Sequence, residues 1–156
     1  MNAPLIFVIH VWATMFLVGL IWIIQCVHYP LLDRVGVDGF KTYEADHSRM
    51  ITPVVAPLML VELATAILIA GGACPAIVPN WAAWLGLLAV VAIWASTFFI
   101  QVPCHTRLAA GFDAGAYQTL VLSNWIRTIL WTGRGILLGY VLWRALQSNM
   151  VPALES

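Results

Sequence analysis

The stretch WIRTILWTGRGILLGYVLWRA, residues 125–145, is apolar over the length of a bilayer-crossing helix, yet it carries Arg127 and Arg134. A helix needs about 20 residues to cross the hydrocarbon core. A charged side chain at the centre of such a helix costs at least about 2.5 kcal/mol, so it usually faces a functional interior. The stretch therefore predicts a membrane helix whose two arginines face the interior of a helix bundle.

Three further apolar runs precede it, at residues 5–27, 51–71 and 81–102. The chain is 62% hydrophobic and 9% charged, and no run alternates in the way of a barrel strand. The first run has neither a basic leader nor a small-residue cleavage site, so we interpret it as a retained span. We predict one all-α domain over residues 1–156, an integral membrane four-helix bundle with up-down topology.

The connections between these runs differ in length and polarity. Residues 72–80 form a short uncharged turn, whereas residues 28–50 and 103–124 are longer and polar. In an up-down bundle the two long connections lie on the same side of the membrane. They hold most of the basic residues outside the spans, and such an excess marks cytoplasmic loops. We predict both long connections in the cytoplasm and both termini outside, and we expect the bacterial inner membrane as the location.

Each long connection is expected to contain a short amphipathic helix. Asp38 and Asp113 are suitable N-cap residues, and apolar residues recur at helical spacing after each of them. Such helices either rest on the lipid headgroups or form a lid over the mouth of the bundle.

The topology also brings polar residues from separate parts of the chain to one face of the membrane: His28, Glu44, His47, Gln101, His105, Asn124 and Arg127. Glu44 and His47 stand three apart on a predicted helix and project the same way, as in helix-bundle metal sites. The candidate ligands of a single Fe, Cu or Zn ion are His28, Glu44, His47 and His105. The alternatives are histidines that only form hydrogen bonds and an Arg127 that snorkels to the headgroups.

A second polar group is predicted deeper in the membrane. Glu62 and Arg134 fall at similar depth, so pairing them would limit the cost of burying either charge. They form either a purely structural pair or the floor of a cavity in which Arg134 holds an anionic or quinoid oxygen. Trp131 shares the helix face of the arginines and is placed to stack on an aromatic ligand.

His10 lies near the outer end of the first span, on the stripe that leads to Gln25 and His28. It is either a hydrogen-bonded core histidine or a haem ligand. The candidate cofactor-binding residues are therefore His10, Gln101, Trp131 and Arg134, with haem as the alternative to a transition metal. The cysteines form no C-x-x-C pair and are expected to be small packing residues.

Two segments carry a resemblance to a known family, QVPCHTRL at residues 101–108 and NWIRT at residues 124–128, followed by Arg134. The sequence resembles the DUF1772, or anthrone-oxygenase-like, family of small four-span membrane proteins. That family typically has a Pro-polar-x-x-Leu turn after its third span and a Trp-x-x-x-Arg-like entry to its fourth. The resemblance implies a four-span fold and oxidation of polyketide anthrones to anthraquinones. His105 stands where many members are expected to have Asn, which favours a ligand or a base at this position.

A fainter likeness is to the HemJ-type protoporphyrinogen oxidases. Those proteins also have a histidine early in the first span and a second span that contains Met and Pro. Their third-span lysine is missing here, because residues 81–102 contain neither Lys nor His. This departure argues against carrying over their haem chemistry.

Together these features predict a small membrane oxidoreductase or oxygenase that takes a lipophilic, aromatic substrate from the bilayer. His105 would act as a metal ligand or a base, while Arg127 and Asn124 would stabilise a developing oxyanion. In a metal-free version, a histidine removes a proton and the carbanion reacts with dioxygen. The alternative function is a non-catalytic membrane subunit that binds haem, quinone or lipid. A transporter is disfavoured, because the chain shows no inverted repeat.

The remaining expectations concern partners. The chain has seven Lys and Arg against seven Asp and Glu, and its formal net charge is zero. Without a basic cluster, no nucleic-acid partner is expected. Membrane lipid and a lipophilic small molecule are the expected partners, and a homo-oligomer is left open.

Overall fold

The computed structural model describes residues 2–150, and this part of the chain is helical without any strand. The elements in chain order are α1 (Ala3–Ile23), η1 (Ile24–His28), α2 (Tyr29–Leu32), α3 (Val37–Ala70), α4 (Asn80–Ser96), η2 (Thr97–Gln101), α5 (Val102–Ala109) and α6 (Ala114–Met150). The elements η1 and η2 are π-helical turns, which join α1 to α2 and α4 to α5 without a break.

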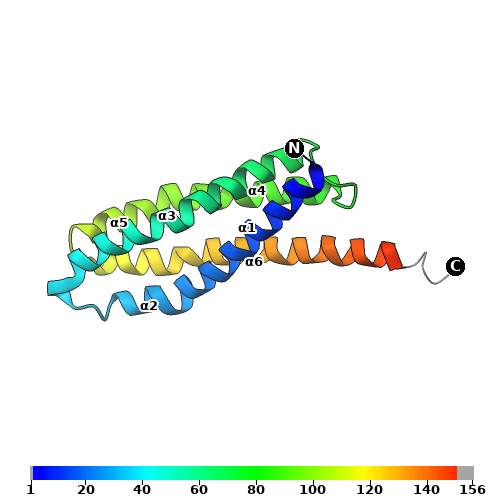
Figure 1. Ribbon diagram of the computed structural model, residues 1–156. Helices are drawn as coiled ribbons and strands as arrows, with labels where there is room; N and C mark the ends of the chain where they lie inside the picture. The colour runs from blue at the N-terminus through cyan, green and yellow to red at the C-terminus, as the bar shows by residue number, and fades with distance from the viewer. Residues whose placement is uncertain (1, 151–156) are drawn as a thin grey trace.

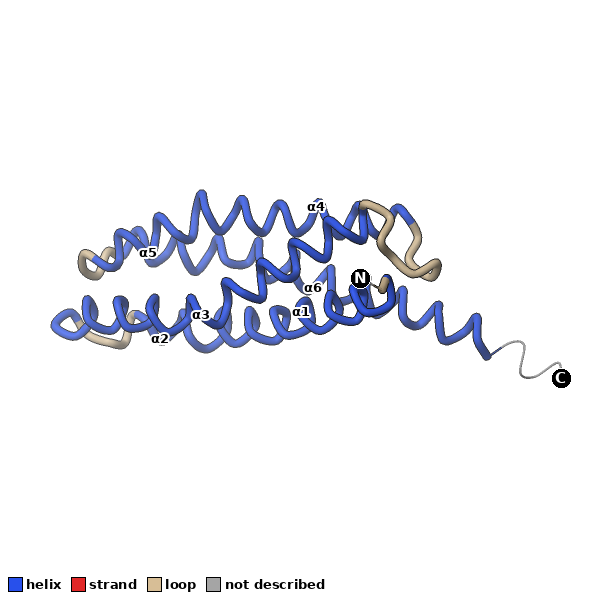
Figure 2. Tube along the Cα trace, turned by 45° about the horizontal axis from the view of Figure 1, so that its top comes forward, coloured by secondary structure: helices blue, strands red, loops and turns tan. Residues whose placement is uncertain are grey.

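These elements form four rods in up-down order, and α1 begins at the end of the bundle where α6 ends (Figures 1 and 2). The predicted four-helix bundle is therefore confirmed. Three continuous helices are long and apolar enough to cross a membrane: Ala3–Leu32, Val37–Ala70 and Asn80–Ala109. The fourth rod, α6, is less apolar because it contains three arginines, and it packs along α1 and α4 within the same bundle. The chain is a membrane-embedded helical bundle whose apolar helices contact lipid.

The helices expected after Asp38 and Asp113 exist, but they are not separate from the spans. Each is the first part of a long helix, because α3 runs unbroken for 34 residues and α6 for 37. The short helices of the two long connections are instead α2 and α5. Phe40, which is fully buried, packs edge-to-face on Phe112 at 5.0 Å and ties the start of α3 to the turn before α6. This contact holds the extensions in the bundle, so neither forms an independent lid.

Only one of the two predicted caps is correct. The Ala116 backbone N–H donates to Asp113 Oδ1 at 2.9 Å, so Asp113 caps α6 as expected. That bond and the Arg107 guanidinium hold the pKa of Asp113 below its ordinary value. Asp38 lies in the first turn of α3 instead, because Gly36 with φ of 83° takes the N-cap position. A positive φ of this size favours glycine.

The two halves of the bundle repeat the same order of elements. In each half, a long apolar helix passes through a π turn into a short helix with Pro near its start, then through a turn with a positive-φ glycine into a second long helix. The π turns contain Ile24-Gln25 and Ile100-Gln101, and both glutamines are buried. One inserted residue rotates the following helix by about 100°, and π turns are frequent at functional sites. The first π turn ends at the candidate His28, and the second ends shortly before His105.

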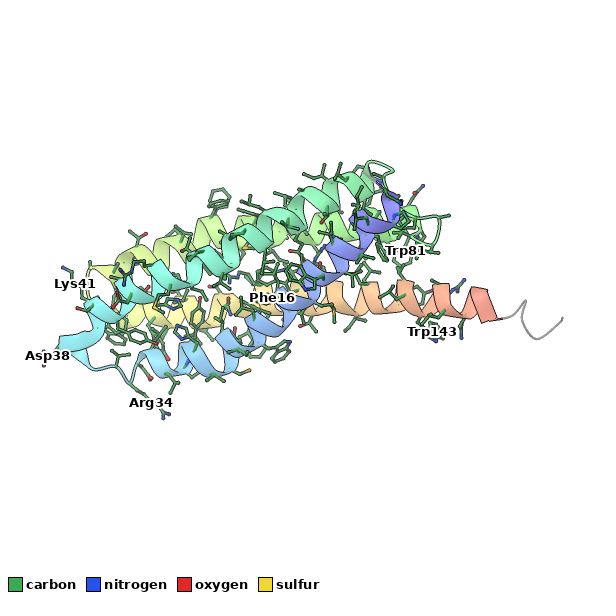
Figure 3. All side chains as sticks on the ribbon, in the orientation of Figure 1. Phe16, Arg34, Asp38, Lys41, Trp81 and Trp143 are labelled. Atoms are coloured by element: carbon green, nitrogen blue, oxygen red, sulfur yellow. The ribbon has the colours of Figure 1, made fainter. Side chains whose placement is uncertain are left out.

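Two apolar clusters fill the bundle, one at each end. The smaller contains Phe7, Ile69 and Val141, and the larger includes Leu32, Phe40 and other residues from all four rods. Between them lies a layer of buried polar residues, which contains His10, Thr14, Glu62, Thr65 and Arg134. Figure 3 shows charged Arg34, Asp38 and Lys41 at one end of the molecule and Trp81 and Trp143 toward the other. The candidate site lies toward the charged end.

Candidate functional site

An imidazole held by a buried carboxylate forms the centre of the candidate site. Glu44, on α3, has no exposed surface, and its Oε1 lies 2.6 Å from His105 Nδ1 on α5. With an ionised Glu44 and a neutral imidazole, Nδ1 carries the proton and Nε2 is left as an acceptor, because a carboxylate only accepts hydrogen bonds. Nε2 lies 3.2 Å from the hydroxyl of Tyr29 on α2, which would donate to it in this tautomer. This geometry gives His105 the tautomer of a general base.

The three histidines at this face come together as the topology predicts. His28 and His47 stack with ring centroids 4.2 Å apart and planes inclined by 25°. The ring centroids of His47 and His105 are 5.6 Å apart. Residues from η1, α3 and α5 therefore share one small volume, although they are distant in sequence.

The arrangement of these side chains does not present a metal site as it stands. In the described part of the chain, no group of three or more His, Cys, Asp or Glu side chains is placed to hold a metal ion. Ring nitrogens bind metals in the plane of the ring, and two stacked rings direct their nitrogens past a common point. Glu44 Oε2 and His28 Nε2 are buried without a hydrogen-bond partner. Ligation by His28, Glu44, His47 and His105 stays a prediction that requires the rings to turn.

Arg127 on α6 is a buried charge without an ion-pair partner among the described residues. Its side chain is buried, with a residue exposure of 7%, so it does not snorkel to the surface. No described residue forms an ion pair or hydrogen bond with it, and its Nε is buried without a partner. The guanidinium carbon lies 5.4 Å from the centre of the Trp131 ring. A buried cation of this kind is costly unless something pairs with it.

A groove of about 510 Å³ opens beside these groups, between α3 and the rod of α4, η2 and α5. Its walls are mostly apolar, and Leu60 and Phe98, which are 56% and 57% exposed, place its mouth on the outer face of the bundle. Its polar lining residues include Tyr29, His47, Gln101, His105 and Arg127. The groove is therefore open to the lipid side and polar at its inner end.

A second opening meets the same two histidines from another direction. It has a volume of about 410 Å³, and its lining includes His47, Ser48, Thr52, His105 and Thr106. Ser48 also donates to Glu44 Oε1 at 3.4 Å. The imidazoles of His47 and His105 thus border both the apolar groove and a more polar opening.

The buried amides next to the site are hydrogen-bonded to other groups of the bundle. Asn124 Nδ2 donates to Gln25 Oε1 at 2.8 Å, and Asn124 is not among the residues that line the groove. Gln101 accepts from Ser96 and donates to Ser123, each at 3.0 Å, while it borders the groove. Gln101 is therefore in place to meet a ligand, whereas the role predicted for Asn124 as an oxyanion donor would use its remaining N–H.

The predicted pairing of Glu62 with Arg134 is present. Arg134 Nε donates to Glu62 Oε1 at 3.2 Å, and a second nitrogen, Nη2, lies 3.1 Å from the same oxygen. Trp131 donates its indole N–H to Glu62 Oε2 at 3.0 Å, and Thr14 donates to Oε1 at 2.8 Å. Arg134 also donates to the Gly86 carbonyl. Both carboxylate oxygens are thus satisfied inside the bundle, in the manner required of a buried ion pair.

His10 belongs to the same network. Its Nδ1 lies 2.7 Å from Thr65 Oγ1, and its Nε2 lies 3.1 Å from an Arg134 nitrogen. The cavity that His10 and Arg134 line measures about 20 Å³, which is room for one water. Haem iron on His10, or a quinoid oxygen on Arg134, would require these bonds to break and the core to open. The residues here fit a structural network better than a cofactor site.

Tyr29 is a site residue that the sequence pattern did not indicate. It follows His28 directly and precedes Pro30, but one residue of helical rotation decides whether it faces lipid or the interior. In the structure it is buried, lines the groove together with Arg127 and is hydrogen-bonded to His105.

Comparison of the chain with protein-family models, curated proteins and solved structures finds no match.

Proposed function

We propose that the protein is a small membrane oxygenase, which removes a proton from a lipophilic aromatic substrate and lets the resulting carbanion react with dioxygen. One observation carries the proposal. A carboxylate-oriented imidazole, Glu44–His105, lies at the polar inner end of an apolar groove that opens to the lipid side. The likeness of residues 101–108 and 124–128 to the anthrone-oxygenase-like family points to the same chemistry.

The groove suits a substrate that arrives from the bilayer. Its walls include Met59, Trp94 and Phe98, which offer apolar and aromatic surface to a flat ring system. Pockets for small molecules are generally of this kind, mostly apolar with a few placed polar groups. A substrate that fills the groove excludes water from the imidazole, and this strengthens every electrostatic contact at the inner end.

In the proposed reaction, His105 Nε2 accepts a proton from a methylene group beside a carbonyl, either directly or through the Tyr29 hydroxyl. The electron pair left behind spreads onto the carbonyl oxygen as an enolate, and the Arg127 cation stabilises that negative charge. Glu44 keeps His105 in the correct tautomer and stabilises the imidazolium that forms. The enolate carbon then donates electrons to dioxygen, and loss of water leaves a new carbonyl. The balance is one methylene and one dioxygen giving one carbonyl and one water.

A metal-assisted form of the same function would place Fe, Cu or Zn on the histidine cluster. This form is supported by the unsatisfied Glu44 Oε2 and His28 Nε2, which are two donors without partners. The polar opening next to His47 and His105 would give the proton a way to the end of the bundle that bears the charged connections. We place that end on the cytoplasmic side of a bacterial inner membrane, following the distribution of basic residues.

The second candidate is a non-catalytic subunit that holds a quinone or lipid in the groove. The favouring observation is the strongly apolar lining between α3 and α4. Such a protein would bind a flat ligand but would not consume oxygen.

The test uses the purified full chain in detergent, with anthrone as the substrate and uncatalysed oxidation subtracted. Oxygen uptake and anthraquinone formation should rise together in a one-to-one ratio. His105→Asn should lower the rate by about 10²–10⁴-fold, the usual contribution of a general base. Arg144→Gln, at an exposed position of α6, is the matched control and should leave the rate unchanged. Equal rates for the wild-type protein and His105→Asn would refute the proposal.

A further inference from the structure

We propose, building on the proposed function, that the groove binds a lipophilic aromatic ligand as an anion, with its ionised oxygen on the Arg127 guanidinium. The feature that carries this is the charge of Arg127, which is buried at the inner end of the groove without a hydrogen-bond or ion-pair partner in the described chain.

Neither of the buried carboxylates nearby serves as the missing partner. Glu62 is occupied by Arg134, Trp131 and Thr14. Glu44 is turned to His105, whose Nδ1 lies 2.6 Å from Glu44 Oε1. The bundle thus neutralises Arg134 and leaves Arg127 uncompensated two helical turns away on the same helix.

The position of Arg127 is maintained without neutralising its charge. The Trp131 ring lies under the guanidinium, and Glu62 fixes that ring by accepting its N–H. A cation on an aromatic face keeps its N–H groups free at its edge. The guanidinium is therefore supported from one side and remains available to a ligand in the groove.

The chemistry of the ligand follows from these contacts. An arginine fork binds carboxylates and other ionised oxygens with paired, charge-assisted hydrogen bonds. The apolar walls require the rest of the molecule to be lipophilic, and Trp94 and Phe98 favour an aromatic body over an alkyl chain. The ligand class is therefore an aromatic acid, either a carboxylate or a phenol or enol that ionises on binding.

The experiment compares 2-naphthoate with 2-naphthamide, which has the same shape but no charge. Calorimetric titration of the full chain in detergent should show at least a tenfold preference for the anion. Arg127→Gln should remove that preference, Arg127→Lys should keep part of it, and the control Arg144→Gln should keep all of it. Because both probes enter the same micelles, the ratio of affinities in wild type divided by the ratio in Arg127→Gln cancels partitioning into detergent.

Several outcomes would overturn the proposal: equal affinities of the two probes, no binding of either, or a preference that survives Arg127→Gln. Decanoate, paired with decanamide, tests the aromatic part, and an equal or greater preference for decanoate would overturn that assignment. If Arg127→Gln fails to fold, as judged by circular dichroism, Arg127→Lys supplies the comparison. Binding without oxygen uptake would refute the proposed reaction alone, whereas turnover without a charge preference would refute anion binding alone.

Discussion

Arg127 and Arg134 lie two helical turns apart on the same face of α6, yet Glu62 pairs with Arg134, and no described residue forms an ion pair with Arg127. Trp131 stands between them, with its N–H on Glu62 and its ring under Arg127. On one side of Trp131 the polar groups are hydrogen-bonded to each other, and on the other side the Arg127 cation borders the groove. We interpret the first as structural and the second as the binding end of the groove.

The first prediction concerns the stability of the polar layer. Glu62→Gln or Arg134→Met should each destabilise the bundle by about 3–5 kcal/mol, because each leaves a buried charge without its partner. The double variant should lose less than the sum of the two. Thermal unfolding in one detergent measures all three, and Arg127→Gln is the control, which should lower the melting temperature much less because it breaks no ion pair of the described residues. Strictly additive losses would mean that Glu62 and Arg134 are not coupled.

The second prediction concerns metal content. If the histidine cluster binds a transition metal, protein purified without chelator should contain about one ion per chain. His47→Ala or His105→Ala should then lose most of the metal while the helical circular dichroism remains. His10→Ala is the matched control, because both nitrogens of His10 are engaged in the polar layer. A wild-type protein that takes up no Fe, Cu or Zn would leave the metal-free reaction.

The third prediction concerns membrane sidedness. A cysteine placed at Asp38, in a variant without the native cysteines, should react with a membrane-impermeant maleimide only after the cells are opened. Asp38 and Lys41 project at the charged end of the molecule (Figure 3), which the positive-inside rule places in the cytoplasm. The opposite end is tested through a cysteine at Asn80, the first residue of α4. Labelling of the Asp38 position in intact cells would show that the topology is the reverse of the predicted one. Ser156, which would report on the C-terminal end, lies outside the described residues.

The fourth prediction concerns the Asp113 cap. Its bonds to Ala116 and Arg107 lower the pKa of Asp113 below the ordinary 3.8. The stabilising effect of the ionised cap is therefore fully present above pH 3.8 and is lost as pH falls through the lowered folded-state pKa. Asp113→Ala should melt below the wild-type temperature at neutral pH, and the difference should shrink in acid.

Asp38→Ala is the matched control for that experiment, since Asp38 lies in the first turn of α3, where no side-chain cap bond forms. A gap between wild type and Asp113→Ala that stayed constant down to pH 2 would show that the cap acts independently of its charge.

Much of the fold follows from the pattern of apolar residues. The four rods, their up-down order and the meeting of His28, His47 and His105 all follow from where each apolar run begins and ends. The separate lid helices are the main departure, because nothing in the local sequence shows that residues 37–50 would join the following span into one helix. Pro53 and Pro57 even suggest a break, yet α3 continues through both. Packing of Phe40 and Glu44 in the bundle outweighs the two lost backbone bonds.

The sequence by itself determined the depth of each polar residue in the membrane, because helical rise converts residue number into distance along the rod. That was enough to pair Glu62 with Arg134 and to gather the histidines at one end. Only the tertiary structure decided which groups touch: Tyr29 contacts His105, His10 joins the polar layer, and Arg127 borders the groove without an ion-pair partner among the described residues. The reason is rotation about the helix axis. Each π turn rotates the following residues by about 100°, and inter-helix packing, which sequence periodicity does not specify, sets the rest.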